Sequence, residues 1–171
     1  GATSDVIEPL RHYIGARPPA NADKVILGTG LRSSDELAAM VNGTMAAALE
    51  FDDVLSLMPG HPSAVVVAAL MANDRALDAS GAQVIEAYAV GVEAGARVAQ
   101  ALTLDHYKRG FHTTGTLALF SAVAALARIQ RLSPTLVKRS LGLAASMSSG
   151  LQGNFGTMAK PLHSGWAARN A

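Results

Sequence analysis

The sequence predicts an all-α protein, with one helical domain over residues 1–171. Helical periodicity runs from Ser33 almost to the end of the chain, half of the residues are hydrophobic, and only 16% are charged. Small residues recur along the expected helices, for example at residues 46–48, Gly91 and Gly95. Because small side chains let helix axes approach closely, these observations favour a tightly packed helical core.

The start of the chain is less regular than the rest. We expect a short helix over residues 6–14, a loop over 17–22, and a short strand over 24–27 that the glycines at 28 and 30 end. A capping box of Ser33 and Glu36 then predicts the start of the first long helix. Its apolar face would hold Leu37, Met40, Val41, Thr44 and Ala48.

Two helices are predicted in the middle of the chain. Pro62 is a favoured residue for a first helical position, so we expect a helix over residues 63–77. Residues 82–102 give the clearest amphipathic pattern, with Glu93 and Arg97 paired on the polar face. The expected apolar stripe of this helix is Ile85, Tyr88, Ala89, Val92, Ala96 and Ala99.

Two further helices and a loop complete the pattern. We expect helices over residues 114–131 and 135–148, the second capped by Ser133 and started by Pro134. Residues 150–161 are rich in glycine and are predicted to form a loop. From His163 the sequence is typical of a helix with no stop signal, so we interpret the chain as a fragment of a larger protein.

Composition excludes several classes of function. The chain has no cysteine, which rules out disulfides and a cysteine nucleophile and fits a reducing compartment. The net charge is +1 and the basic residues are scattered, so we expect no nucleic-acid partner. The longest apolar run, residues 64–72, is about half of a membrane span, and the N-terminus lacks the order of a signal peptide. We therefore expect no membrane partner and a cytoplasmic location.

Three of the five histidines share one sequence context. His61, His112 and His163 each come just before small or hydroxyl-bearing residues and an expected helix. A helix start offers unpaired N–H groups that attract anions, and imidazole changes charge near neutral pH. The repeated pattern predicts three helix starts that face one pocket, whereas a single such histidine is more typical of a cap or of a hydrogen bonder in the core.

Lys160 adds a positive charge close to His163. It lies in a mostly apolar loop, and the following Pro161 favours an extended backbone at Lys160. A lysine held in this way is a candidate for binding a carboxylate, or for acting as a base if burial lowers its pKa. The alternative is an ordinary surface lysine whose stem covers apolar neighbours.

An acidic cluster, Glu50-Phe51-Asp52-Asp53, precedes His61 by eight to eleven residues. These carboxylates are candidates for a general acid or base, or for orienting His61. A divalent metal on Asp52, Asp53 and His61 is the alternative, but the spacing matches no strong ligand motif, and we expect no metal. A solvated helix end is a further alternative, although acids at the end of a helix oppose its dipole, and this local conflict points to a function.

Taken together, these motifs resemble the MmgE/PrpD family, which contains 2-methylcitrate dehydratase, cis-aconitate decarboxylase and iminodisuccinate epimerase. Four segments carry the resemblance, in this order: residues 42–53 (NGTMAAALEFDD), 60–63 (GHPS), 110–115 (GFHTTG) and 158–165 (MAKPLHSG). The resemblance implies a large helical domain plus a smaller α+β domain, with this chain in the helical part, and a homodimer.

The resemblance also implies which residues act. The catalytic residues would be His112, Lys160, His61 and Glu50. Substrate-binding residues would be His163, Asp53 and Thr113. The sequence departs from the family pattern in having Glu50 in place of an aspartate and Val54 where a threonine is frequent.

The expected function is that of a metal-independent lyase without a cofactor, acting on a small di- or tricarboxylic acid. The first expectation is proton abstraction and loss of water next to a carboxylate, as in 2-methylcitrate dehydratase. Here protonated histidines and Lys160 would bind carboxylates, and His112 or Glu50 would move the proton. Decarboxylation of cis-aconitate and epimerisation of iminodisuccinate are the alternatives within the family. The rival from another class is a non-catalytic helical assembly module.

Overall fold

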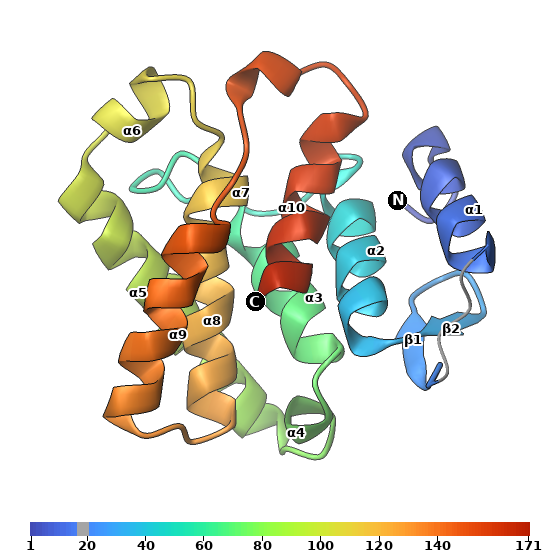
Figure 1. The fold of residues 1–171 in the computed structure, drawn as a ribbon, viewed down its shortest axis with the longest axis horizontal. Helices are drawn as coiled ribbons and strands as arrows, with labels where there is room; N and C mark the ends of the chain where they lie inside the picture. Colours follow the sequence, from blue (N-terminus) through green and yellow to red (C-terminus); the bar gives the residue numbers. More distant parts are fainter. Residues whose placement is uncertain (17–20) are drawn as a thin grey trace.

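The computed structural model describes residues 1–16 and 21–171, and this part of the chain is all-α apart from one hairpin (Figure 1). The predicted fold class is confirmed. The chain begins with an N-terminal unit, residues 1–16 and 21–33, whose elements are η1 (Asp5–Ile7, a 3₁₀ helix), α1 (Glu8–Ala16), β1 (Lys24–Ile26) and β2 (Leu31–Ser33). The two strands are antiparallel, with Val25 opposite Arg32. The predicted loop over residues 17–22 lies mostly outside the described residues.

The second strand was not expected, and it changes where the first long helix starts. α2 (Asp35–Ala47) follows Ser34, whose backbone is extended and whose side chain makes no capping hydrogen bond. Ser33 pairs with Lys24 at the end of β2 and is fully buried. The predicted capping box of Ser33 and Glu36 is therefore wrong, because strand pairing holds Ser33 away from the helix start.

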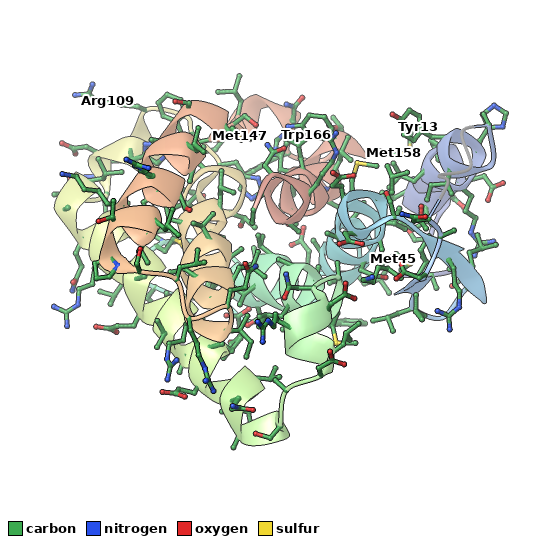
Figure 2. All side chains as sticks on the ribbon, turned by 60° about the horizontal axis from the view of Figure 1, so that its bottom comes forward. Tyr13, Met45, Arg109, Met147, Met158 and Trp166 are labelled. Carbon is green, nitrogen blue, oxygen red and sulfur yellow. The ribbon has the colours of Figure 1, made fainter. Side chains whose placement is uncertain are left out.

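The middle of α2 is buried on all sides. Residues 38–45 have no exposed member, since the N-terminal unit covers one side of the helix and α3 (Pro62–Met71) and α10 (Ala159–Asn170) cover the other. A small apolar cluster, which contains Met45 of α2 (labelled in Figure 2) and Ile7, Ile14 and Ile26 of the N-terminal unit, joins this unit to α2. A helix that is surrounded in this way needs apolar or small residues all round, as its sequence has.

Lys24 provides a second link between the N-terminal unit and the helices. Its side chain is only 3% exposed, and Nζ lies 2.7 Å from Asp23, 2.8 Å from Asp74 and 3.4 Å from Asp35. Asp35 is the first residue of α2, and Asp74 is the first of α4 (Asp74–Leu77). The carboxylates, with Asp23 contributing most, raise the pKa of Lys24. The charged amine therefore ties β1 to two helices.

The main core lies between the long helices of the bundle (Figure 1). α5 (Gly81–Leu102) packs along α8 (Ala118–Ile129), and α8 also contacts α3 and α9 (Pro134–Met147). α10 packs along α2 and contacts α3. Ser133 caps α9 by accepting a hydrogen bond from the amide of Leu136, as predicted.

The buried face of α5 differs from the predicted stripe. Ile85 is 69% exposed and Ala89 is also exposed, whereas Ala87, Gly91 and Gly95 are buried against α8. A Cβ atom on Gly91 would lie 2.5 Å from the carbonyl oxygen of Ser121, so only glycine permits this approach. The periodicity located the helix correctly, but close packing rather than side-chain hydrophobicity selects its inner face.

Two predicted helices are each divided. The helix expected over 63–77 ends as α3 at Met71, and Asn73 caps the separate α4 by accepting a hydrogen bond from Ala76. The helix expected over 114–131 consists of α7 (Thr113–Thr116) and α8, which meet at Leu117. α6 (Asp105–Lys108) fills the connection between α5 and α7.

The region from 150 to 161 contains more structure than a loop. It holds the 3₁₀ turn η2 (Gln152–Asn154) and the first turn of α10. Lys160 is therefore helical, which contradicts the extended backbone predicted from Pro161. The proline occupies the third position of α10, where a backbone N–H has no partner within the helix, so the first turn tolerates it. Because α10 already begins at Ala159, His163 lies one turn inside this helix and not at its start.

Candidate active site

Two of the three predicted histidines stand at helix starts that meet. His61 is the N-cap residue of α3 and His112 is the N-cap residue of α7. The amide of His61 donates to the hydroxyl of Thr114 over 3.0 Å, which ties the loop before α3 to α7. Residues 53 positions apart in the chain are joined in this way, at the end of the bundle where α10 also begins (Figure 1).

His112 is held firmly in the interior. Its side chain is only 3% exposed, and its amide donates to the carbonyl of Gly150 over 3.0 Å. Its Nδ1 lies 2.9 Å from Nδ1 of His163, so one proton is shared between the two imidazoles. The ring of Phe155 packs edge-on against the imidazole of His112, with 4.9 Å between the ring centroids. These contacts fix the orientation of the imidazole.

Lys160 and Glu50 form an ion pair across the site. The Nζ atom of Lys160 donates to Oε1 of Glu50 and lies 5.2 Å from the centroid of the Phe155 ring. Glu50 follows the end of α2 with a backbone φ of 54°, a left-handed conformation that is uncommon for glutamate. The strained turn aims the Glu50 carboxylate at the start of α10.

The two aspartates of the acidic cluster have different surroundings. Both carboxylate oxygens of Asp52 are buried without a hydrogen-bond partner among the described residues, although Oδ1 lies 3.4 Å from Nδ1 of His61. That distance is within electrostatic range, but the same Nδ1 is hydrogen-bonded at 2.9 Å to the carbonyl of Asp53. The Asp53 side chain points elsewhere and accepts from the amide of Ser63, in the first turn of α3, over 3.1 Å.

These groups surround a small pocket. Its polar lining comes from the end of α2, the loop before α3 and the starts of α7 and α10. The lining residues are Ala47, Glu50, Asp52, His61, His112, Lys160, Pro161 and Ser164. The pocket therefore combines an amine, two imidazoles and two carboxylates within a few residues of four helix ends.

The two imidazoles that line the pocket have opposite acid–base tendencies. The Asp52 carboxylate is the main cause that raises the pKa of His61. Burial, helped by the nearby positive charge of Lys160, lowers the pKa of His112 to about 4. Burial also lowers the pKa of His163. Near neutral pH His112 is thus neutral, while the raised pKa of His61 makes it take up a proton more readily than an ordinary histidine.

Four of the predicted site residues come together in this pocket, and three do not line it. His61, His112, Lys160 and Glu50 belong to its polar lining. His163 stands behind His112, the Asp53 side chain caps α3, and the Thr113 hydroxyl donates to the carbonyl of Pro59. Because these three side chains do not line the pocket, their role in binding substrate stays a prediction.

Asp52 lines the pocket but was not predicted as a catalytic or substrate-binding residue. Its sequence signal is membership of the acidic cluster 50–53 that precedes His61. Alternation along the chain gives no such signal, because the backbone of Glu50 is left-handed and Asp52 lies in a bend, so the stretch is not an extended strand. Packing selects Asp52 instead: Phe51 is 92% exposed, whereas both carboxylate oxygens of Asp52 are buried.

Two further observations bear on the class of site. Within residues 1–16 and 21–171, no three histidine, aspartate or glutamate side chains are grouped so that they could hold a metal ion. In the same part of the chain, no helix has the length and apolar character needed to cross a membrane.

The fold and the pocket define a helical domain with a buried acid–base cluster of imidazole, amine and carboxylate groups. Comparison with known families gives this class a name: residues 1–171 match the MmgE/PrpD N-terminal domain, and the chain belongs to this family. The resemblance found in the sequence is thereby confirmed.

Characterised relatives are cis-aconitate decarboxylases. The chain is 29% identical to the enzyme of Aspergillus terreus, over 98% of this chain and 40% of the relative. It is 30% identical to the human enzyme, over 99% of this chain and 36% of the relative. A cis-aconitate decarboxylase-like protein of Aspergillus oryzae, oryM, is 31% identical over 85% of this chain and 32% of the relative. The chain thus spans well under half the length of these relatives.

Proposed function

We propose that the protein is a lyase that acts, without a metal, on a small di- or tricarboxylic acid at the carbon next to a carboxylate. The observation that carries this proposal is the pocket in which Lys160, His61 and the buried His112 converge. Groups whose surroundings push their pKa values apart are the usual mark of divided acid and base roles. Membership of the MmgE/PrpD family and the similarity to cis-aconitate decarboxylases support the same substrate class.

Substrate binding in this proposal depends on positive charge at the pocket. Lys160 now binds the carboxylate of Glu50, so a substrate carboxylate would take the place of Glu50 on the amine. His61, when protonated, provides a second positive group in the same pocket. Two cationic groups in one small pocket favour a molecule with at least two carboxylates.

Decarboxylation is the activity that we favour within the family. The bond between the carbon and one carboxylate breaks, carbon dioxide leaves, the electron pair stays on the carbon, and a proton is then added there. Stabilising the negative charge on that intermediate is the main task, and cationic or N–H groups in a buried site perform it well. His61 and His112 offer such groups. Dehydration needs a proton to leave the carbon and a hydroxyl to leave as water, and it uses the same pocket.

The proposal is tested by assaying the intact protein with cis-aconitate, 2-methylcitrate and iminodisuccinate, with and without a metal chelator. We expect release of carbon dioxide from cis-aconitate, with turnover unchanged by the chelator. His112→Ala should reduce turnover by about 10²–10⁴-fold, the usual contribution of a group that exchanges a proton or stabilises charge. His12→Ala, at an exposed position in α1, is the matched control and should leave turnover unchanged.

The outcomes separate the parts of the proposal. Turnover of 2-methylcitrate alone would replace decarboxylation by dehydration, and epimerisation of iminodisuccinate would assign the third family activity. No turnover of any of the three acids would contradict the substrate class. Equal turnover by His112→Ala and the parent protein would contradict the role of His112.

A further inference from the structure

Behind the pocket, three side chains form a hydrogen-bonded series that ends at His112. The Nδ2 atom of Asn154 lies 3.5 Å from Nε2 of His163, and Nδ1 of His163 lies 2.9 Å from Nδ1 of His112. Only His112 of the three lines the pocket. The series therefore connects η2 and α10 to the imidazole at the start of α7.

Asn154 is anchored by its own backbone. It ends the 3₁₀ turn η2, and its carbonyl oxygen accepts from the hydroxyl of Thr157 at 2.8 Å and from the amide of Thr157 at 3.2 Å. The following residue, Phe155, packs against both His112 and Lys160. The side chain of Asn154 thus extends from a fixed turn toward His163.

The chemistry of the groups determines the direction of the series. An amide NH₂ donates hydrogen bonds and cannot accept them, so Nε2 of His163 is the acceptor from Asn154. A neutral imidazole carries one N–H, so the proton of His163 is on Nδ1. This N–H donates to Nδ1 of His112, and the remaining proton of His112 is therefore on Nε2.

We propose that Asn154 and His163 are positioning residues that hold His112 in the tautomer with its proton on Nε2, so that His112 presents an N–H donor to the pocket. Because His112 is buried, water has little access to its imidazole and does not replace these hydrogen-bond partners, so they determine the tautomer. The structure gives Nε2 of His112 no hydrogen bond within the described residues, which leaves this atom available to a ligand.

The consequence for catalysis rests on the proposed function. A neutral His112 with Nε2–H can donate a hydrogen bond to an oxygen that becomes negative in the reaction, but it has no lone pair on Nε2 with which to remove a proton. Any proton removal would then fall to a carboxylate, and in the same pocket both oxygens of Asp52 are buried without a hydrogen-bond partner among the described residues. This division matches decarboxylation, which begins without loss of a proton from carbon.

The experiment is two-bond ¹H–¹⁵N correlation NMR of the histidine rings in the intact, ligand-free protein at neutral pH, with His112 assigned from the spectrum of His112→Gln. This spectrum distinguishes a ring nitrogen that carries a proton from one that does not. We expect the His112 proton on Nε2 and the His163 proton on Nδ1. A His112 proton on Nδ1 in the unmodified protein would overturn the proposal.

A near-isosteric variant tests the cause. In Asn154→Asp the carboxylate can only accept, so His163 should carry its proton on Nε2, and His112 should switch to the Nδ1–H tautomer. Asn170→Asp is the matched control, because Asn170 donates to the carbonyl of Met147 far from the series and its change should leave the tautomer of His112 unaltered. A tautomer of His112 that is the same in Asn154→Asp and the unmodified protein would contradict the positioning role.

The tautomer of His112 is measured without substrate. Failure of the positioning proposal can therefore be told apart from failure of the proposed function. A protein that turns over none of the three acids still shows whether the series operates. An active protein whose His112 carries its proton on Nδ1 would overturn the series and leave the proposed function standing.

Discussion

At the scale of single residues, the two histidines that line the pocket differ in how their protonation is coupled to folding. The pKa of His61 is raised, so its contribution to stability is present below the ordinary histidine pKa and is lost as pH rises through the folded-state value. The pKa of His112 is lowered to about 4, so His112 opposes folding at acid pH. One pocket therefore holds one imidazole whose protonation stabilises the folded state and one whose protonation destabilises it.

His112 should make the protein sensitive to acid. Between pH 6.5 and pH of about 4 the unfolded chain takes up a proton that the folded chain does not, so the free energy of unfolding falls as pH falls. The difference between the two pKa values corresponds to about 3 kcal/mol. His112→Gln removes this group, and its loss of stability over that pH range should be smaller by about this amount. Urea unfolding at a series of pH values measures it.

The control for this prediction is His12→Gln, because His12 is exposed. Its pH dependence should follow that of the unmodified protein. Parallel curves for His112→Gln and the unmodified protein between neutral pH and pH 4 would show that the folded state accommodates the charge of His112.

Lys160 should contribute mainly to substrate binding. Lys160→Met keeps an apolar stem against Phe155 but removes the charge that now binds Glu50. A lost hydrogen bond to a charged group costs about 1.5–3 kcal/mol, so KM should rise roughly tenfold to hundredfold, with a smaller change in kcat. Lys138→Met, on the exposed side of α9, serves as the control in the same steady-state assay. A fall in kcat at constant KM would instead place Lys160 in the chemical step.

At the scale of elements, the ends and contacts of the helices carry information that periodicity does not. The apolar periodicity of the helix expected over 63–77 continues past Asn73, although Asn73 caps a new helix there. An asparagine cap competes with helix continuation through its own side chain, a local signal that the apolar pattern hides. The inner face of α5 was missed for a related reason, since Gly91 and Gly95 are buried by close helix approach and not by hydrophobicity.

The close contact between α2 and α10 should depend on the absence of a side chain at Gly165. A Cβ atom on Gly165 would lie 2.1 Å from the carbonyl oxygen of Met40 and 2.1 Å from the hydroxyl of Thr44. The helices would have to separate, so Gly165→Ala should lower the free energy of unfolding by about 1–3 kcal/mol or more. Gly142→Ala, on the exposed side of α9 with open space at its Cβ, should raise it by up to about 1 kcal/mol.

Chemical denaturation of the two alanine variants provides the measurement. Opposite signs are expected from the same substitution in two helices. Equal stabilities for Gly165→Ala and the unmodified protein would mean that α2 and α10 can move apart without cost. Because α10 carries Lys160 and His163, the first variant should also reduce turnover.

At the scale of the whole molecule, the sequence predicted the fold class and the groups of the pocket, but not how those groups are arranged. His61, His112, Lys160 and Glu50 could be selected because their residue types and local contexts indicate acid–base chemistry. That His163 lies behind His112, and that Asn154 lies behind His163, depends on contacts between residues 51 positions apart and on the turn η2. Local patterns do not encode such contacts, since they arise when α7 and α10 pack against each other.

The N-terminal unit should open before the main core does. It is joined to α2 by a small apolar cluster and by the ion pairs of Lys24, whereas α8 is buried in the large cluster, with Leu119, Ala122 and Ala125 fully buried. Local opening energies follow such differences in burial. Native-state hydrogen exchange should therefore show lower protection for the amides of β1 and β2 than for those of α8. Lys24→Met should lower the protection of the strands further and leave α8 unchanged, because the three carboxylates then lose their shared cation. Equal protection of the strands and α8 would show instead that the N-terminal unit and the helices unfold as one cooperative body.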